Sequence, residues 1–189
     1  MCIRDRPLTI NRIAAEADAI LEGWYLGEAT GKAVAEVLLG KVNPSGKLPV
    51  SFPRSVGNLP AYYNRHPSAF GLRYINADNE PLYPFGFGLS YTTFEYGKPT
   101  ADSKTMQADG TLTVKVSVKN TGAREGQEVV QLYISDKKSS LPRPVKELKG
   151  FQKVKLAPGE TKEVTFTIDK EALSPVSYTH LTLPTNSRV

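Results

Sequence analysis

The sequence has little cysteine, histidine or tryptophan, and it has no long apolar run. Its 189 residues contain one cysteine, two histidines and one tryptophan. The cysteine is Cys2, in a terminal segment that we interpret below as foreign to the protein. It therefore gives no information about disulfides or about the compartment. No apolar stretch is long enough to cross a bilayer. With 40% hydrophobic and 23% charged residues, the chain otherwise has the composition of a globular protein with one large or two small domains.

Positive charge is in modest excess. The formal net charge is +5, of which residues 1–6 and Arg188 contribute one unit each. Basic residues are spread along the rest of the chain, apart from Lys137-Lys138 and the stretch 146–155. A solvated strand face explains these stretches better than a nucleic-acid surface does, so we expect no nucleic-acid partner.

The two ends of the chain differ from the rest. Residues 1–6 and the tail 176–185 resemble translated sequencing-adaptor sequence. We therefore interpret residues 1–6 and 175–189 as foreign to the protein and leave them out of the fold prediction. On this interpretation the chain is a fragment, and the lack of a recognisable leader at its start has no meaning.

Residues 7–96 have the pattern of an α/β domain. A short strand is expected at 7–10, followed by a helical turn through Ala17 with Asn11 as its N-cap. Residues 19–24 are predicted to form a mostly buried strand. The order strand, helix, strand favours a partly parallel sheet covered by helices.

A helix is predicted over residues 30–39, after Gly27. Its apolar residues Ala33, Val34, Val37 and Leu38 recur on one face. Gly40 is expected to end this helix as the C′ residue.

The pattern changes after a polar segment rich in glycine and proline, residues 97–110, which we interpret as a linker. In residues 112–118 apolar and polar residues alternate, and the same period of two recurs at 130–134 and 164–168. Strands at this spacing with no helix between them predict an antiparallel β-sandwich over 111–174.

Two unusual motifs stand at residues 43–53 and 82–94. They are rich in glycine, proline and aromatic residues and contain no nucleophile–base pair. Glycines such as Gly86 and Gly88 permit positive φ or close chain approach, and the prolines fix φ. We expect the second motif to form a tight structural crossing. Gly86-Phe87-Gly88 is too short for a phosphate-binding loop.

These motifs closely resemble the C-terminal half of glycoside hydrolase family 3, the β-glucosidase and β-xylosidase group. The segments that carry the resemblance follow one another in the family's order: 19–24, 43–53, 81–94 and 129–135, and then 143–151 and 158–160, which resemble a fibronectin type III-like module. The resemblance covers residues 7–174. It implies the end of an α/β sandwich domain at 7–96, a linker at 97–110 and an incomplete fibronectin type III-like β-sandwich at 111–174.

The family hydrolyses O-glycosyl bonds with retention of configuration, which requires two neighbouring carboxyl groups. None of the acidic residues of the first region pairs convincingly by spacing: Glu16, Asp18, Glu22, Glu28, Glu36, Asp78, Glu80 and Glu95. The resemblance places both catalytic carboxyl groups upstream of residue 1. We therefore assign no catalytic residue and expect the fragment to be inactive; the alternative is a non-catalytic carbohydrate-binding or protein-interaction module.

A weaker hypothesis concerns substrate binding by Trp24 and Glu28, at the end of the predicted strand 19–24. An aromatic plane beside a carboxylate suits a sugar. The alternative is that Trp24 packs in the core and Glu28 favours the positive end of the helix dipole. Many relatives have a Gln-Glu pair where this chain has Glu28-Ala29, which weighs against the sugar-facing role.

Three tyrosines, Tyr62, Tyr63 and Tyr74, could line a sugar pocket, although aromatic loop residues more often pack a domain joint. His66 has no companion ligand at metal spacing and is interpreted as a loop residue. No metal or cofactor is expected, and the expected partner is the glycoside substrate of the full-length enzyme. Compartment and oligomeric state stay open; a periplasmic or secreted location fits the full-length enzyme.

Truncation of the β-sandwich carries its own expectation. Missing strands should leave open edges and leave the apolar residues Val130, Leu132 and Ile134 partly uncovered. We therefore expect the isolated chain to be poorly soluble.

Overall fold

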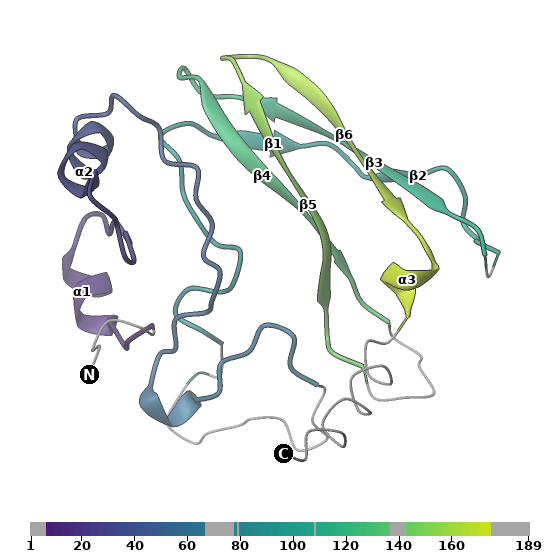
Figure 1. The fold of residues 1–189 in the computed structure, drawn as a ribbon, viewed down its shortest axis with the longest axis horizontal. Helices are drawn as coiled ribbons and strands as arrows, with labels where there is room; N and C mark the ends of the chain where they lie inside the picture. The colour runs from purple at the N-terminus through teal and green to yellow at the C-terminus, as the bar shows by residue number, and fades with distance from the viewer. Residues whose placement is uncertain (1–6, 67–77, 79, 108, 137–142, 175–189) are drawn as a thin grey trace, which may run out of the picture.

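The structure, a computed structural model, describes residues 7–66, 78, 80–107, 109–136 and 143–174. Figure 1 shows two parts, which we call the helical region (residues 7–93) and the β region (residues 94–174). The described elements, in chain order, are α1 (Asn11–Glu16), α2 (Thr30–Leu38), a 3₁₀ turn (Val56–Asn58), β1 (Phe94–Tyr96), β2 (Thr100–Ala101), β3 (Leu112–Asn120), β4 (Gly126–Ile134), β5 (Glu147–Leu156), β6 (Thr161–Ile168) and α3 (Lys170–Leu173).

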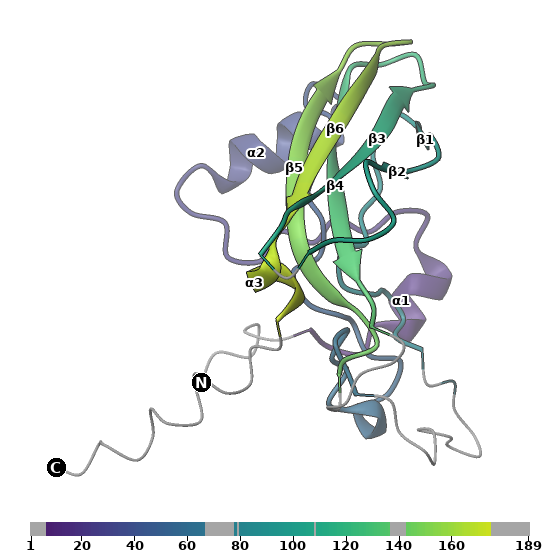
Figure 2. The same cartoon turned by 90° about the vertical axis from the view of Figure 1, so that its right-hand side faces the viewer.

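The β region consists of two antiparallel sheets that face each other (Figure 2). In the four-stranded sheet, β3 pairs with β6 along nearly its whole length, and β1 and β2 pair with successive parts of β3. The second sheet is the pair β4–β5, which has a register shift between Leu132 and Tyr133. The sequence prediction of an antiparallel β-sandwich is confirmed.

The core of the β region lies between the two sheets. Both sheets contribute to one buried cluster, which consists of Val118, Val130, Val154, Leu156 and Val164. Phe94, Val116 and Phe166 pack against this cluster. The apolar residues point inward at every second position because side chains alternate between the two faces of a strand. Lys153 and Lys155 occupy the opposite, exposed positions of β5, as expected for a solvated strand face.

The expectation that truncation uncovers β4 is wrong for Val130, whose side chain is only 3% exposed. It lies opposite Gln152 of β5 and inside the core cluster. Leu132 and Ile134 are half-buried, as expected for residues near the end of the pair.

Asn120 closes one end of the β region. Its side chain is fully buried and donates to the carbonyls of Arg124 and Leu156, at 2.8 and 3.1 Å. Its side-chain oxygen accepts from the hydroxyl of Thr92 and the N–H of Gly122. All its polar capacity is therefore used, so the amide is tolerated in the core.

The helix α2 ends where the sequence predicts. Gly40 has a φ of +69°, and its N–H donates to the carbonyl of Val37. The N–H of Lys41 donates to the carbonyl of Glu36 at 2.8 Å. These two bonds form a Schellman motif, in which a glycine at C′ adopts the left-handed conformation without penalty.

The start of α1 differs from the prediction. Ile10, and not Asn11, is the N-cap residue, and no side chain caps the helix. The side chain of Asn11 instead donates to the carbonyl of Arg54 at 2.5 Å. The Asn11 side chain thus makes a tertiary hydrogen bond and does not cap α1 as predicted.

The two strands predicted at 7–10 and 19–24 are not formed in the structure, so the partly parallel sheet is absent from the described part of the helical region. Ile20 and Leu21 are exposed instead of buried. A strand requires a neighbouring strand to satisfy its backbone groups, and the described residues of this region provide none. The apolar pattern of 19–24 is therefore present without the partner that would bury it.

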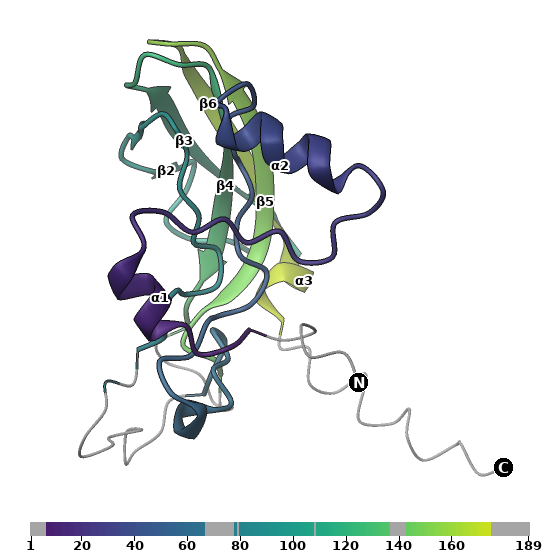
Figure 3. The same ribbon diagram turned by 90° about the vertical axis from the view of Figure 1, so that its left-hand side faces the viewer.

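The two motifs at 43–53 and 82–94 pair with each other. Phe52 and Leu82–Tyr83 exchange backbone hydrogen bonds of 2.8 Å, and Leu48 does the same with Gly86 and Phe87. We call residues 43–53 and 82–93 together the joint. The joint runs between the helices and the strands in Figures 1 and 3.

Glycine is required where the two halves of the joint meet. A Cβ atom on Gly88 would lie 2.3 Å from the carbonyl oxygen of Gly46, a distance that real Cβ atoms do not reach. Gly86 has a φ of +80°, and its carbonyl accepts from the Gln131 side chain of β4. The expectation that the second motif forms a tight structural crossing is confirmed.

The segment 97–110, expected to be a linker, contains β2, and β1 lies in the last residues of the stretch assigned to the first domain. Both strands pair with β3. The domain boundaries themselves stay a prediction.

Candidate functional site

Trp24 and Glu28 were the residues predicted to face a sugar. Trp24 has a φ of +49° and is 39% exposed, and its ring lies 6.0 Å from that of Phe52 at a tilt of 42°. The backbone N–H of Trp24 donates to the Glu22 carboxylate at 3.0 Å. The ring therefore packs on the joint with one side and meets solvent with the other.

Glu28 is exposed and lies two residues before the first residue of α2. In the described part of the chain, no hydrogen bond or ion pair joins Glu28 to the Trp24 side chain. Both alternatives remain compatible with these positions, and the sugar-facing role of the two residues stays a prediction.

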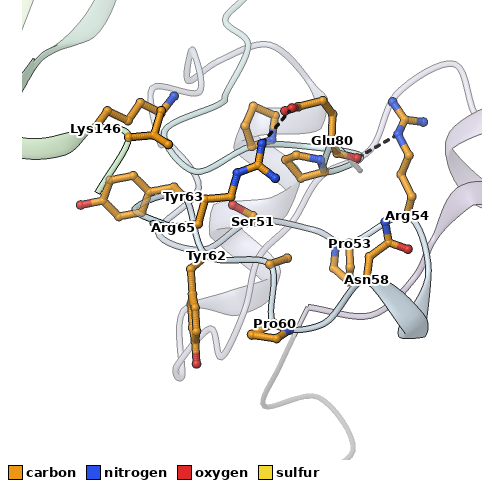
Figure 4. A pocket seen from close by; sticks show the side chains of 14 residues that line it. Ser51, Pro53, Arg54, Asn58, Pro60, Tyr62, Tyr63, Arg65, Glu80 and Lys146 are labelled. Atoms are coloured by element: carbon orange, nitrogen blue, oxygen red, sulfur yellow. Dashed lines mark hydrogen bonds and ion pairs between the residues drawn. The ribbon is translucent and has the colours of Figure 1, made fainter. Parts of the chain in front are cut away.

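A cavity of about 230 Å³ lies where the joint, the loop that follows residue 53 and the residues before β5 meet (Figure 4). Three segments form its walls: the loop 51–65, the stretch 80–84 and the residues that precede β5. It is lined by Ser51, Pro53, Arg54, Asn58, Pro60, Ala61, Tyr62, Tyr63, Arg65, Glu80, Pro81, Pro84, Val145 and Lys146.

Three basic side chains and one carboxylate line the cavity: Arg54, Arg65, Lys146 and Glu80. Nη2 of Arg65 lies 3.3 Å from Oε1 of Glu80. Nε of Arg54 donates to the backbone carbonyl of Glu80 at 3.2 Å and lies 3.7 Å from the Asp78 carboxylate. The side chain of Asn58 donates to the carbonyl of Asp78 at 2.9 Å. Residues 78 and 80 thus serve as acceptors for the loop on the opposite side.

A stacked aromatic group forms the inner wall. Tyr63 stacks on Phe85 with ring centroids 4.1 Å apart, and both rings meet the edge of Tyr133. Nζ of Lys146 lies 5.4 Å above the Tyr133 ring. Burial raises the pKa of the Tyr133 phenol above its ordinary value, and the nearby Tyr63 raises it further. Tyr63 therefore packs between the two regions.

Tyr62 has a different environment, since its side chain is 68% exposed at the edge of the cavity. Figure 4 shows its ring away from the arginines, on the lower side of the opening. Tyr63 therefore packs the joint, as one of the two alternatives predicted, whereas Tyr62 is exposed and its role in a sugar pocket stays a prediction. Tyr74 lies outside the described residues, as do Lys137 and Lys138.

A buried ionic network connects the joint to the β region. Nζ of Lys47 lies 3.2 Å from the Glu128 carboxylate, with side chains only 17% and 10% exposed. The Tyr96 hydroxyl donates to the same carboxylate at 2.9 Å. Burial raises the pKa of Tyr96 most, and the charge and hydrogen bond of Glu128 raise it further. Lys47 also donates to the carbonyl of Gly88.

The described residues offer no metal cluster and no membrane-spanning helix. No cluster of three or more His, Cys, Asp or Glu residues that could hold a metal ion occurs there. His66 lies in an exposed loop position. None of the described helices combines the length and apolarity needed to span a membrane.

The sequence interpretation did not single out Arg54, Arg65 or Lys146, and it considered Glu80 only as a catalytic candidate. Arg65 and Lys146 are far apart in the chain, and no spacing rule connects them. Among the described residues that line the cavity, Glu80 is the one carboxylate.

Comparison with known proteins identifies both regions. Residues 1–91 match the glycosyl hydrolase family 3 C-terminal domain, and residues 128–183 match a fibronectin type III-like domain. Both matches extend into the terminal segments that we interpret as foreign, so that interpretation stays a prediction.

Similar proteins are glycosidases. A periplasmic β-glucosidase of Salmonella typhimurium is 52% identical over 178 residues, which make up 89% of this chain and 23% of that protein. A β-xylosidase of Formosa agariphila is 50% identical over 91% of this chain and 24% of its own length.

Solved structures give the same result. A β-glucosidase from Erythrobacter marinus superposes with a TM-score of 0.86 at 51% identity, covering 88% of this chain and 22% of that one. The β-glucosidase from Listeria innocua in complex with glucose gives a TM-score of 0.84 at 42% identity, over 92% and 26% of the two chains. The chain spans about a quarter of the length of these relatives. With its two regions matched in order, the chain belongs to glycoside hydrolase family 3, as a part that carries the C-terminal domain and the fibronectin type III-like domain.

Proposed function

We propose that this chain is the C-terminal part of a retaining glycoside hydrolase that acts on β-glucosides or β-xylosides. The observation that carries the proposal is the name and similarity of the relatives: a β-glucosidase and a β-xylosidase are each at least half identical over about nine-tenths of this chain. At that level of identity the two regions have the same fold as their counterparts in the longer enzymes.

We also propose that the chain alone has no hydrolase activity. Retaining hydrolysis needs two carboxyl groups about 5–5.5 Å apart. Glu80 is the one carboxylate among the described residues that line the cavity, and it forms an ion pair with Arg65. A nucleophile and an acid/base would therefore be supplied by protein outside these residues.

The surface of the helical region supports this view. Large apolar side chains are exposed along residues 8–39, which include α1, α2 and the segment between them: Leu8, Ile13, Ile20, Leu21, Trp24, Tyr25, Leu26, Leu38 and Leu39. Extended apolar surface of this kind usually marks a contact with further protein. The rest of the α/β sandwich domain, as found in the family, is the occupant that we expect.

The contribution of this part to the whole enzyme is structural. The joint fixes the β region against the sandwich through backbone bonds and through the Lys47–Glu128 pair. Such a rigid attachment would hold the sandwich domain in one conformation, on which a catalytic geometry built from two domains depends.

A chimeric enzyme tests the proposal. The matching 178 residues of the Salmonella typhimurium β-glucosidase would be replaced by this chain, and hydrolysis of 4-nitrophenyl β-glucoside measured. The chimera should hydrolyse the glycoside, whereas the chain alone and the relative without its C-terminal part should not.

Two outcomes would contradict it. A folded chimera without activity would remove the assignment to an active enzyme and favour the module interpretation. Hydrolysis by the chain alone, lost in Glu80→Gln, would show that a catalytic carboxyl group lies within it.

A further inference from the structure

We propose that the edge of β4 that faces away from β5 is an interaction surface, and that its occupant is the β4 strand of a second copy of this chain. The two strands would lie antiparallel about a two-fold axis near Leu132. The β4–β5 pairs of both copies would then form one continuous sheet. This inference goes beyond the proposed function, because it concerns how the chain associates and involves no glycoside.

The backbone of β4 is paired on one side. β4 and β5 form a two-stranded antiparallel sheet. In the part of the chain that the structure describes, no hydrogen bond joins the β4 backbone to a residue outside this pair. In an antiparallel pair, about half of the backbone N–H and carbonyl groups of a strand point away from its neighbour. Such a row of free donors and acceptors is a template for a further strand.

β4 lacks the residues that usually prevent pairing at a sheet edge. It has no lysine, arginine or proline among its nine residues. Its one charged side chain, Glu128, is already neutralised by Lys47 at 3.2 Å. β5 is different, since it contains Lys149, Lys153 and Lys155, and Lys149 is its extra residue at the register shift. Lysines and bulges protect edge strands, so β4 is the edge that is open to association.

A second β4 strand has the pattern that this edge requires. Antiparallel pairing about Leu132 places Leu132 opposite its own counterpart and Val130 opposite Ile134 of the second copy. Gln131 would lie opposite Tyr133 of the second copy, on the other face. Apolar and aromatic cross-strand pairs stabilise a sheet, and no like charges meet in this register. Because both copies use the same patch, the interface closes as a dimer.

The inner face beside this edge is only partly covered. Val130 is buried, but Leu132 and Ile134, nearer the end of β4, are half-buried. Val114 and Val116 of β3, in the opposite sheet, are half-buried too. Figure 1 shows the two sheets apart at this end, since β4 ends in the lower middle of the view and β3 begins at the right. A further strand beside β4 would therefore remove apolar surface from water.

The exposed apolar residues of the helical region are the competing surface for association. They lie along residues 8–39, on two helices and the segment between them, and offer side chains alone. The edge of β4 adds backbone donors and acceptors, which bond a neighbouring strand in a fixed pattern. A defined dimer is therefore expected through β4, and the two surfaces can be told apart by experiment.

Sedimentation equilibrium of the full 189-residue chain tests the proposal. One strand pair buries less area than a standard interface, so we expect a monomer–dimer equilibrium with a Kd of about 20 µM. Hydrogen exchange at about 1 µM and about 200 µM then locates the contact, because association shifts with concentration by mass action. The β4 amides that do not bond to β5 should exchange about fivefold more slowly at the higher concentration.

Two variants place a charge at the edge. Leu132→Lys and Ile134→Lys each introduce two lysines into the symmetric dimer, so the Kd should rise at least about tenfold. The matched control is Phe151→Lys, which adds the same charge to β5 at a position that is 69% exposed. Its Kd should stay within about twofold of the wild type. Circular dichroism verifies the fold of each variant, and hydrogen exchange of the wild type requires no variant.

Three results would overturn the proposal: a monomer over the whole concentration range, the same Kd in the edge variants and the control, or concentration-dependent protection in residues 8–39 in place of β4. Equal protection of the β4 edge at both concentrations would show that the same chain covers it, which would also overturn the proposal. The chimera experiment is unaffected by any of these results.

Discussion

The helical region and the β region differ in how they bury their apolar residues. In the β region, two sheets cover each other, and Val118, Leu156 and Val164 have no exposed surface. In the helical region, Leu38 of α2 and the apolar residues of 19–26 lie largely at the surface. The β region thus buries a core between its own two sheets, whereas the apolar residues of the helical region lack such a cover among the described residues.

The difference follows from how each kind of element is paired. Strands β3 to β6 follow one another within about 60 residues, and each finds its partner within this chain. A sheet in the middle of an α/β sandwich instead needs neighbouring strands on both sides. The apolar residues of the two regions are therefore buried to different extents.

Removing one leucine from each region should show the largest contrast. Leu156→Ala should lower the free energy of unfolding of the β region by about 2–5 kcal/mol, because it opens a cavity in a closed core. Leu38→Ala, at an exposed position of α2, should change it by less than about 0.5 kcal/mol. Urea unfolding followed by far-UV circular dichroism measures both. Equal effects would mean that the helical region has a core of its own.

The contact between the regions should be the next most sensitive place. Lys47→Met leaves the buried Glu128 carboxylate without its cation, which should cost about 3 kcal/mol. The fluorescence of Trp24, the one tryptophan, would then report unfolding of the helical region separately from circular dichroism of the strands.

The matched control is Arg12→Ala, which removes an exposed ion pair to Glu16 and should cost at most about 0.5 kcal/mol. If Lys47→Met and Arg12→Ala behave alike, the Lys47–Glu128 pair does not attach the two regions.

A smaller, pH-dependent effect should come from Tyr96. Its pKa is raised in the folded protein, so above pH about 10 the unfolded chain loses this proton before the folded one does. The stability associated with Tyr96 is therefore complete below that pH and is lost as pH rises further. Tyr96→Phe should cost about 1 kcal/mol at pH 7 through the lost hydrogen bond to Glu128.

Urea midpoints at pH 8 and pH 11 measure this difference. The wild type should lose more stability than Tyr96→Phe between the two values. An identical loss in both proteins would show that Glu128 does not hold the Tyr96 proton.

The parts of the fold that could be predicted are those set by local pattern. The alternation in 112–118 defines β3, and Gly40 ends α2 because only a glycine adopts its φ without strain. The prediction of a strand at 19–24 was wrong because a strand depends on more than local pattern. The apolar residues of 19–24 are present, but a strand also needs a neighbouring strand to bond its backbone, and a local pattern does not specify one.

The cavity could not be predicted for a related reason. Its walls combine the loop around Arg65 with Lys146, and these meet only because the joint places the β4–β5 sheet beside the loop. The sequence provided one signal, the adjacent tyrosines Tyr62 and Tyr63, without the polar residues that accompany them. Docking between regions is a tertiary event with no fixed spacing in the chain.

The hydrogen bonds between Phe52 and Leu82–Tyr83 have a consequence for the segment that they enclose. They clamp both ends of the excursion 53–81 at one point, so the ends stay together whatever the chain does between them. The entropy of closing such an excursion grows only with the logarithm of its length, so a doubling costs about 0.6 kcal/mol. A change in the length of this excursion should therefore leave the scaffold on either side unchanged.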